Sequence, residues 1–158
     1  VLSGGRSSRL WRALVEEGKV ASEVYTVNGS PGARFENLFC VFIEPAQGVP
    51  VMTAVEAARK ELAALFSNPP RPEELERVKK AILADSVRGL VSDVGLARKL
   101  SYFETVAGDW RYIERHPEVL ASITPEEAAR TAKAYFTPSN ETLAFIPDGG
   151  ERGEGEGR

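Results

Sequence analysis

Near its N-terminal end the chain has the sequence GGRSSRLWRALVEEGKVASEVY, residues 4–25. Two glycines make a loop, and the serine pair that follows is typical of a helix N-cap. Apolar residues then recur at helical spacing as far as Gly18, namely Leu10, Trp11, Leu14 and Val15. We therefore predict a glycine loop, a short helix over residues 8–17 and a strand that begins near Val20.

A hairpin and two long helices are predicted next. Residues 20–27 and 35–43 are rich in Val, Phe, Tyr and Thr, and turn residues at 28–32 separate them, which is typical of an antiparallel hairpin. Since both faces of the second segment are apolar near its middle, we expect it to be an interior strand. Long amphipathic helices are expected after Pro50 and from Pro72.

Shorter elements complete the predicted order. Helical segments are expected to begin near Ser92 and near Trp110. The motif TPEE at 124–127 combines an N-cap threonine, a first-turn proline and a capping-box glutamate, so it predicts a helix that ends near Phe136. The pattern of residues 142–146 predicts a short final strand.

Composition and charge limit the class of protein. The chain has 158 residues, of which 42% are hydrophobic and 27% charged, as expected for one globular domain. With 20 basic and 23 acidic residues the net charge is −3, so we expect no nucleic-acid partner. No apolar stretch has the length of a membrane span. We expect a soluble protein, and the sequence leaves open whether it is periplasmic or cytoplasmic.

Few side chains could perform chemistry. A zinc site needs several Cys, His or carboxylate ligands, and the chain has one cysteine and one histidine. Cys40 lies in an apolar run, which predicts a small buried side chain. His116 precedes a proline in a polar stretch, which predicts a surface or loop residue rather than a ligand. The loop at Gly4-Gly5 lacks a phosphate-binding lysine pattern, so we expect a structural turn.

The order of these elements resembles the C-terminal half domains of pitrilysin/insulinase-type zinc metallopeptidases, which include mitochondrial processing peptidase. The resemblance spans residues 2–147 and is most specific in GGRSSRL at 4–10, PEEL at 72–75 and residues 123–146. It implies an α/β fold of the α+β type, in which a mainly antiparallel sheet has helices packed on one face.

The resemblance also implies a domain organisation. Residues 1–147 are expected to form a single half domain that lacks the family's first strands, which normally precede the glycine loop. A missing strand leaves a sheet edge open for pairing with another chain. Residues 148–158 are rich in Gly, Glu and Arg and contain no apolar residue, so we expect a flexible tail.

In complete members of the family, an Arg and a Tyr from the second half hold the substrate carbonyl and stabilise developing charge. Alignment of the segment after SSRL with the family's pattern places Val15 at the Arg position and Ser22 at the Tyr position. Arg12 and Tyr25 lie nearby, but each is shifted by three residues, and an odd shift on a strand moves a side chain to the opposite face. The resemblance therefore implies no catalytic residue in this chain.

The zinc of that family lies in the other half, where an inverted H-x-x-E-H helix and a downstream glutamate bind the metal. This chain contains no such motif. The resemblance thus implies a non-catalytic half domain with no cofactor or metal of its own, which closes a peptide-binding chamber opposite a zinc-bearing half. That half is in the same or a second chain, and we expect a homo- or heterodimer and a peptide substrate.

Two alternatives remain open at this stage. The chain could be an assembly subunit similar to the core proteins of respiratory complexes, which keep the fold without peptidase activity. It could also be an unrelated hydrolase that uses His116, the one histidine available as a base.

Overall fold

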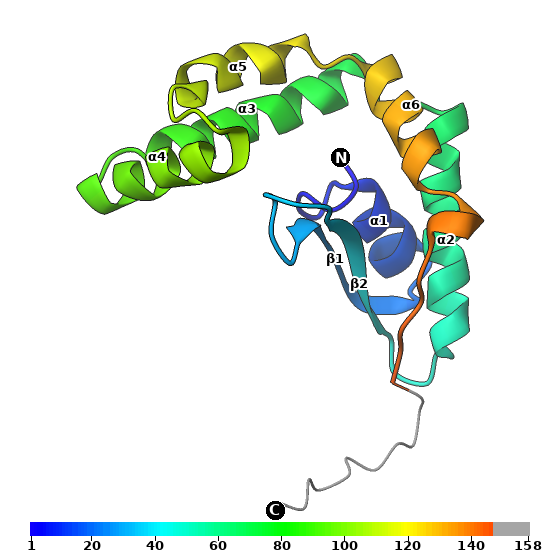
Figure 1. The fold of residues 1–158 in the computed structure, drawn as a ribbon. Coiled ribbons are helices and arrows are strands. Elements are labelled where there is room, and N and C mark those ends of the chain that lie inside the picture. The colour runs from blue at the N-terminus through cyan, green and yellow to red at the C-terminus, as the bar shows by residue number, and fades with distance from the viewer. Residues whose placement is uncertain (147–158) are drawn as a thin grey trace, which may run out of the picture.

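The structure, a computed structural model, describes residues 1–146, which form a two-stranded antiparallel sheet and a set of helices (Figure 1). The elements in chain order are α1 (Arg9–Trp11), the π-helical turn η1 (Arg12–Glu17), β1 (Ala21–Ser30), β2 (Leu38–Pro45), α2 (Val51–Ser67), α3 (Pro72–Arg88), α4 (Asp93–Ala107), α5 (Tyr112–Ser122), α6 (Pro125–Tyr135) and the 3-10 turn η2 (Pro138–Asn140). The tail predicted at 148–158 lies outside the described residues. The α+β class is confirmed.

The predicted first helix is present but differs in its geometry and its cap. Its last part is the π-helical turn η1, and the Gly18 N–H closes this turn by donating to the Ala13 carbonyl at 3.0 Å. A Cβ on Gly18 would lie 2.4 Å from that carbonyl oxygen, so only glycine fits without a shift of the backbone. Ser8 is at the N-cap, as predicted, but its buried hydroxyl makes no capping hydrogen bond and has no partner among residues 1–146.

The predicted hairpin is confirmed, with β1 and β2 antiparallel and Val24 opposite Ile43. The first strand is longer than predicted, because it continues through Asn28–Ser30, where the turn was expected. A register shift between Asn28 and Ser30, with Gly29 at φ 87°, lets the chain stay in the sheet through these turn-forming residues. The connection between the strands therefore falls at residues 31–37.

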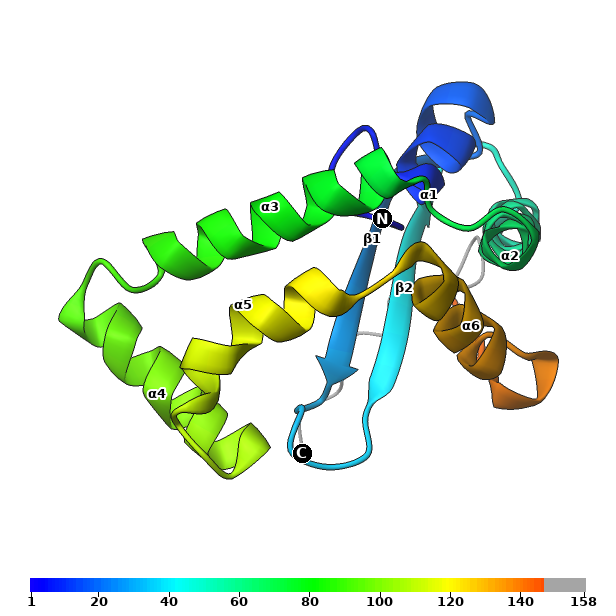
Figure 2. The same ribbon diagram turned by 90° about the horizontal axis from the view of Figure 1, so that it is seen from above.

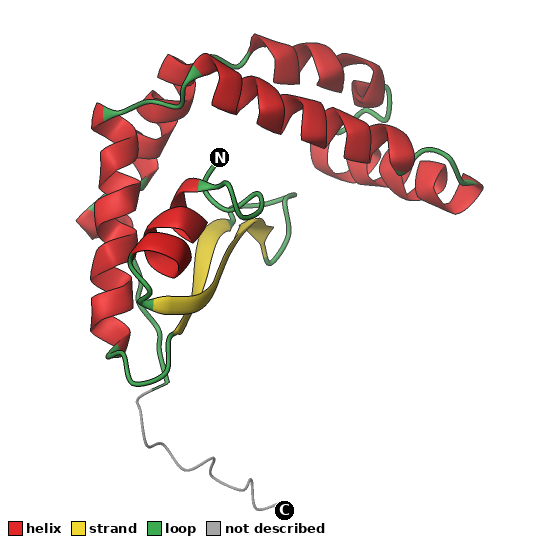
Figure 3. Cartoon of the chain, turned by 180° about the vertical axis from the view of Figure 1, so that it is seen from behind, coloured by secondary structure: helices red, strands yellow, loops and turns green. Residues whose placement is uncertain are grey.

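The core lies between the inner face of the hairpin and the helices α1, η1 and α2. Its fully buried members include Leu10 and Leu14, with 0% of each residue exposed, and they cluster with Ala21, Val24 and Ala58. Figure 3 shows these helices together on one side of the hairpin. The opposite, outer face of the hairpin is not covered by any of them.

Two expectations about the sheet are not met within residues 1–146. The interior position predicted for β2 is not found there, because β2 pairs with β1 alone. Residues 142–146 form no strand, since no backbone group in the described chain pairs with them. The segment is attached instead through Glu141, whose carboxylate accepts a 3.0 Å hydrogen bond from the Arg59 Nε of α2.

The helices α3, α4 and α5, residues 72–122, form a separate unit that we call the arm. Figures 1 and 2 show the arm leaving the rest of the molecule, which we call the body, and extending on the side of the hairpin. A short helical piece was predicted to begin near Trp110, and the structure has a longer helix, α5, which continues through Pro117 to Ser122. The capping box is confirmed: the Thr124 hydroxyl accepts from the Glu127 N–H, and the Glu127 carboxylate accepts from the Thr124 N–H.

We predict that Gly18→Ala lowers the free energy of unfolding by about 1–3 kcal/mol, because the new Cβ forces the π-helical turn to shift. Gly4→Ala is the matched control, since nothing lies within 4 Å of a Cβ added there. It should change the stability by less than about 0.5 kcal/mol. Urea unfolding of both variants gives the comparison. Equal stability of Gly18→Ala and the wild type would contradict the prediction.

Candidate functional site

Val15, the residue aligned with the family's Arg, lies in η1 and is half-buried against the core cluster. Its side chain has no hydrogen-bond donor, so it supports packing and cannot stabilise an oxyanion. Ser22, aligned with the Tyr, is exposed at the start of β1, and its hydroxyl donates to the Glu44 carbonyl at 3.2 Å. Both residues therefore interact with their own scaffold.

Arg12 and Tyr25, the nearby residues of the catalytic types, are engaged separately. The Arg12 guanidinium forms an exposed ion pair with Glu17 at 2.9 Å, one turn further along η1. Tyr25 stacks on Phe42 of the opposite strand, with ring centroids 4.8 Å apart and planes 13° apart. In the described chain no hydrogen bond joins Arg12 to Tyr25, so the structure does not assemble an Arg/Tyr pair from them.

The Tyr25–Phe42 stack is the centre of an exposed apolar surface, which we call the outer face. Cross-strand pairing places Val27 opposite Cys40 and Ser30 opposite Leu38 on the same side of the hairpin. The exposed fractions are 46% for Tyr25, 44% for Phe42 and 64% for Leu38. Isolated exposed apolar residues are common, but a contiguous group on one sheet face is typical of a surface that contacts another molecule.

One end of the outer face is acidic. Glu23 and Glu44 are directly opposite each other in the register, next to the Tyr25–Phe42 pair, and both are exposed. Like charges in this arrangement destabilise a hairpin by a few tenths of a kcal/mol. Neither carboxylate forms an ion pair within residues 1–146.

The two candidate nucleophile and base residues do not meet. Cys40 is only half-buried on the outer face, so the prediction of a buried thiol was wrong. His116 lies in α5, not in a loop, and its ring is 5.6 Å from that of Phe103 and 6.3 Å from that of Tyr112. The helix is longer than the short piece predicted near Trp110, because it continues through Pro117. Leu120 is buried, and the contact of His116 with Phe103 adds to the packing of this longer helix.

Residues 1–146 do not fit a zinc site. In this part of the chain, no three side chains of His, Cys, Asp or Glu converge closely enough to hold a metal ion. Gly5 adopts φ 99° in the loop before α1, which agrees with the structural turn predicted there.

None of the helices described combines the length and apolar character that a bilayer crossing requires.

Comparison with protein families matches residues 1–82 to the family described as peptidase M16 inactive domain. This chain belongs to that family. The resemblance to the C-terminal half of these peptidases is thus confirmed, and so is the assignment of the chain as an inactive peptidase domain of the zinc-protease type. No curated protein matches the chain.

Solved structures of such domains have the same fold as this M16 inactive domain. A protein from Bordetella pertussis Tohama I, described as a zinc protease, has 28% identity and a TM-score of 0.78. The inactive peptidase domain of a Bordetella parapertussis protein described in the same way has 27% identity and a TM-score of 0.79. Each match covers 93% of this chain and 79% of the other.

A protease from Helicobacter pylori has 20% identity and a TM-score of 0.76, over 89% of this chain and 33% of that one. At this identity the likeness shows the fold alone.

We predict that His116 has a packing role in this M16 inactive domain. His116→Ala should lower the free energy of unfolding by about 0.5–1.5 kcal/mol through loss of ring contacts. His116→Phe, which keeps a ring there, should restore most of that stability. Neither variant should change peptide hydrolysis by an assembly that contains this chain. Loss of hydrolysis in the well-folded His116→Phe variant would support the alternative of a hydrolase with a His116 base.

Proposed function

We propose that this M16 inactive domain closes a peptide-binding chamber opposite a zinc-bearing H-x-x-E-H half. The observation that carries the proposal is the outer face, which exposes the Tyr25–Phe42 stack and Leu38 while helices cover the other face of the same hairpin. A sheet that is apolar on both faces needs a second contact, and an unfolded peptide supplies apolar side chains.

The residues aligned with the family's Arg and Tyr indicate which half supplies the catalytic groups. We infer that Val15 and Ser22 replace the Arg and Tyr that complete members use. Val15 packs on the core and Ser22 bonds to the backbone of Glu44, so neither is available to a substrate carbonyl. In this proposal the zinc and the water-activating glutamate come from a partner half in the same or a second chain, within a homo- or heterodimer. The Arg and the Tyr then come from the second half of another subunit.

We also infer that strands outside residues 1–158 complete the sheet of the half domain. The Thr26 N–H points away from β2, because it donates to the Ser3 hydroxyl at 3.1 Å. Its cross-strand partner Val41 must then direct its own N–H and C=O away from β1. By alternation the same holds for Phe39 and Ile43, and no described residue pairs with these groups. The free edge of β2 is thus ready to accept another strand.

Hydrogen exchange tests this completion. In the chain of residues 1–158, we expect the amide protons of Phe39, Val41 and Ile43 to exchange quickly, because nothing protects them. In a longer polypeptide that contains the whole half domain they should become protected. The Tyr25 amide, which faces the β1–β2 ladder by the same alternation, is the control and should be protected in both. Fast exchange at Val41 in the longer polypeptide would rule out a strand on this edge.

Peptide binding tests the role of the outer face. Replacement of Tyr25 and Phe42 together by Ser should weaken the binding of a fluorescein-labelled unstructured peptide by roughly tenfold or more, about 1.4 kcal/mol. The matched control is Tyr135→Ser on α6, an aromatic residue that is 63% exposed and does not belong to the outer face. Fluorescence anisotropy, with the chain alone and with a zinc-bearing half, gives the affinities.

The other outcomes separate the alternatives. Stable association with a zinc-bearing half but no affinity for peptide, in the wild type as in the variants, would favour an assembly subunit. Cleavage of unstructured peptides by the zinc-replete chain alone would overturn the proposal of a non-catalytic half.

A further inference from the structure

Only two short connecting segments of the chain join the arm to the body. Residues 68–71 connect α2 to α3, and residues 123–124 connect α5 to α6. Hinges in proteins consist of a few such residues at the ends of elements, which absorb the change in backbone angles. In residues 1–146 no hydrogen bond or ion pair joins the arm to β1 or β2.

The arm holds together through its own contacts. The Lys79 ammonium of α3 donates to the Ala121 carbonyl at the end of α5 at 2.8 Å and to the Glu76 carboxylate at 2.9 Å. The Phe103 ring of α4 packs against Tyr112 of α5, with centroids 5.3 Å apart. These contacts link all three helices, so the arm can change its orientation as one unit.

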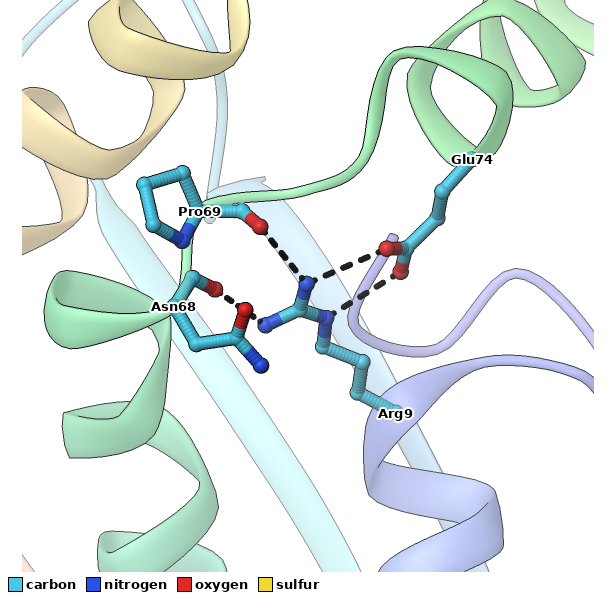
Figure 4. A network of polar contacts seen from close by, with 4 residues as sticks. All are labelled: Arg9, Asn68, Pro69 and Glu74. Atoms are coloured by element: carbon cyan, nitrogen blue, oxygen red, sulfur yellow. Dashed lines mark hydrogen bonds and ion pairs between the residues drawn. The ribbon is translucent and has the colours of Figure 1, made fainter.

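The strongest link between arm and body is the guanidinium of Arg9 (Figure 4). Its Nε and Nη2 each donate to the Glu74 carboxylate in the first turn of α3, both at 3.1 Å. Its Nη1 donates to the Asn68 carbonyl at 2.7 Å, and Nη2 also donates to the Pro69 carbonyl at 3.1 Å. One side chain of α1 therefore holds both the connection and the helix that follows it.

The Arg9–Glu74 pair is well placed to act as a latch. The two side chains are 13% and 10% exposed, so water screens the pair weakly. Burial by itself raises the pKa of Glu74, but hydrogen bonds and charge from Arg9, with an Arg71 backbone hydrogen bond, outweigh it and lower that pKa. The pair therefore stays ionised at neutral pH. One turn along α3, Arg77 adds a single 2.7 Å hydrogen bond to the Ser7 hydroxyl.

We propose that the arm is a hinged lever whose angle to the body is set by the Arg9–Glu74 latch. The latch consists of polar contacts at one place. When the Arg9–Glu74 pair separates, the contacts within the arm and the contacts within the body remain. Opening the latch lets the arm rotate about residues 68–71 and 123–124. Because the arm extends on the hairpin side, this rotation changes how far it overhangs the outer face (Figures 1 and 2).

Distance measurements by pulsed electron paramagnetic resonance test the lever. Spin labels at Lys60→Cys on α2 and Ser101→Cys on α4, both exposed positions, report the separation of body and arm in a Cys40→Ala background. Arg9→Gln and Glu74→Gln should each broaden the distance distribution and shift its centre. Arg9→Lys, which keeps the charge but not the fork of donors, should give an intermediate width.

The matched control is Arg59→Gln. It breaks the Arg59–Glu141 ion pair, which also joins distant segments but lies within the body. Its distance distribution should match the wild type. Circular dichroism and cooperative unfolding identify the variants that remain folded. If Arg9→Gln does not fold, Glu74→Gln decides, because it keeps the size of the side chain. A folded Glu74→Gln protein with the wild-type distribution, even if less stable, would overturn the proposal.

Discussion

Burial of Leu10 and Leu14 against the hairpin is the constraint on which the other contacts of the body depend. The two residues are four apart, so they lie on one side of the α1–η1 helix and meet Ala21, Val24 and Ala58 together. This contact fixes which face of the hairpin is inside. It also aims Arg9, the neighbour of Leu10, at the end of α2 and the start of α3, so that one short helix organises both the core and the position of the arm.

The elements predicted correctly from the sequence are those whose determinants are local. The hairpin follows from β-branched and aromatic residues on both sides of a turn cluster, and the Thr124–Glu127 capping box follows from four adjacent residues. The π-helical turn at η1 could not be predicted, because it depends on the approach of Gly18 to the Ala13 carbonyl. The absence of a strand at 142–146 depends on pairing partners, which no local pattern encodes.

For the candidate site, the sequence predicted only that the usual catalytic and metal-binding residues are missing. The composition of one histidine and one cysteine predicts no self-contained zinc centre, and the alignment of Val15 and Ser22 with the family's Arg and Tyr stays a prediction. The outer face was partly visible in the alternation of Leu38, Cys40 and Phe42, but its exposure was not. Both faces of β2 are apolar, which from sequence indicates burial, and only the structure shows that one of these faces has no helix over it.

The topology of the arm has a consequence for how the chain can vary. Helices α2 and α6 pack against each other although the whole arm separates them in sequence, so the arm begins and ends at neighbouring points. The entropy lost on closing a loop grows only with the logarithm of its length, about 0.6 kcal/mol for each doubling. Lengthening, shortening or exchanging the arm thus costs the body little stability, and the Leu10–Leu14 scaffold could carry arms of different reach in different relatives.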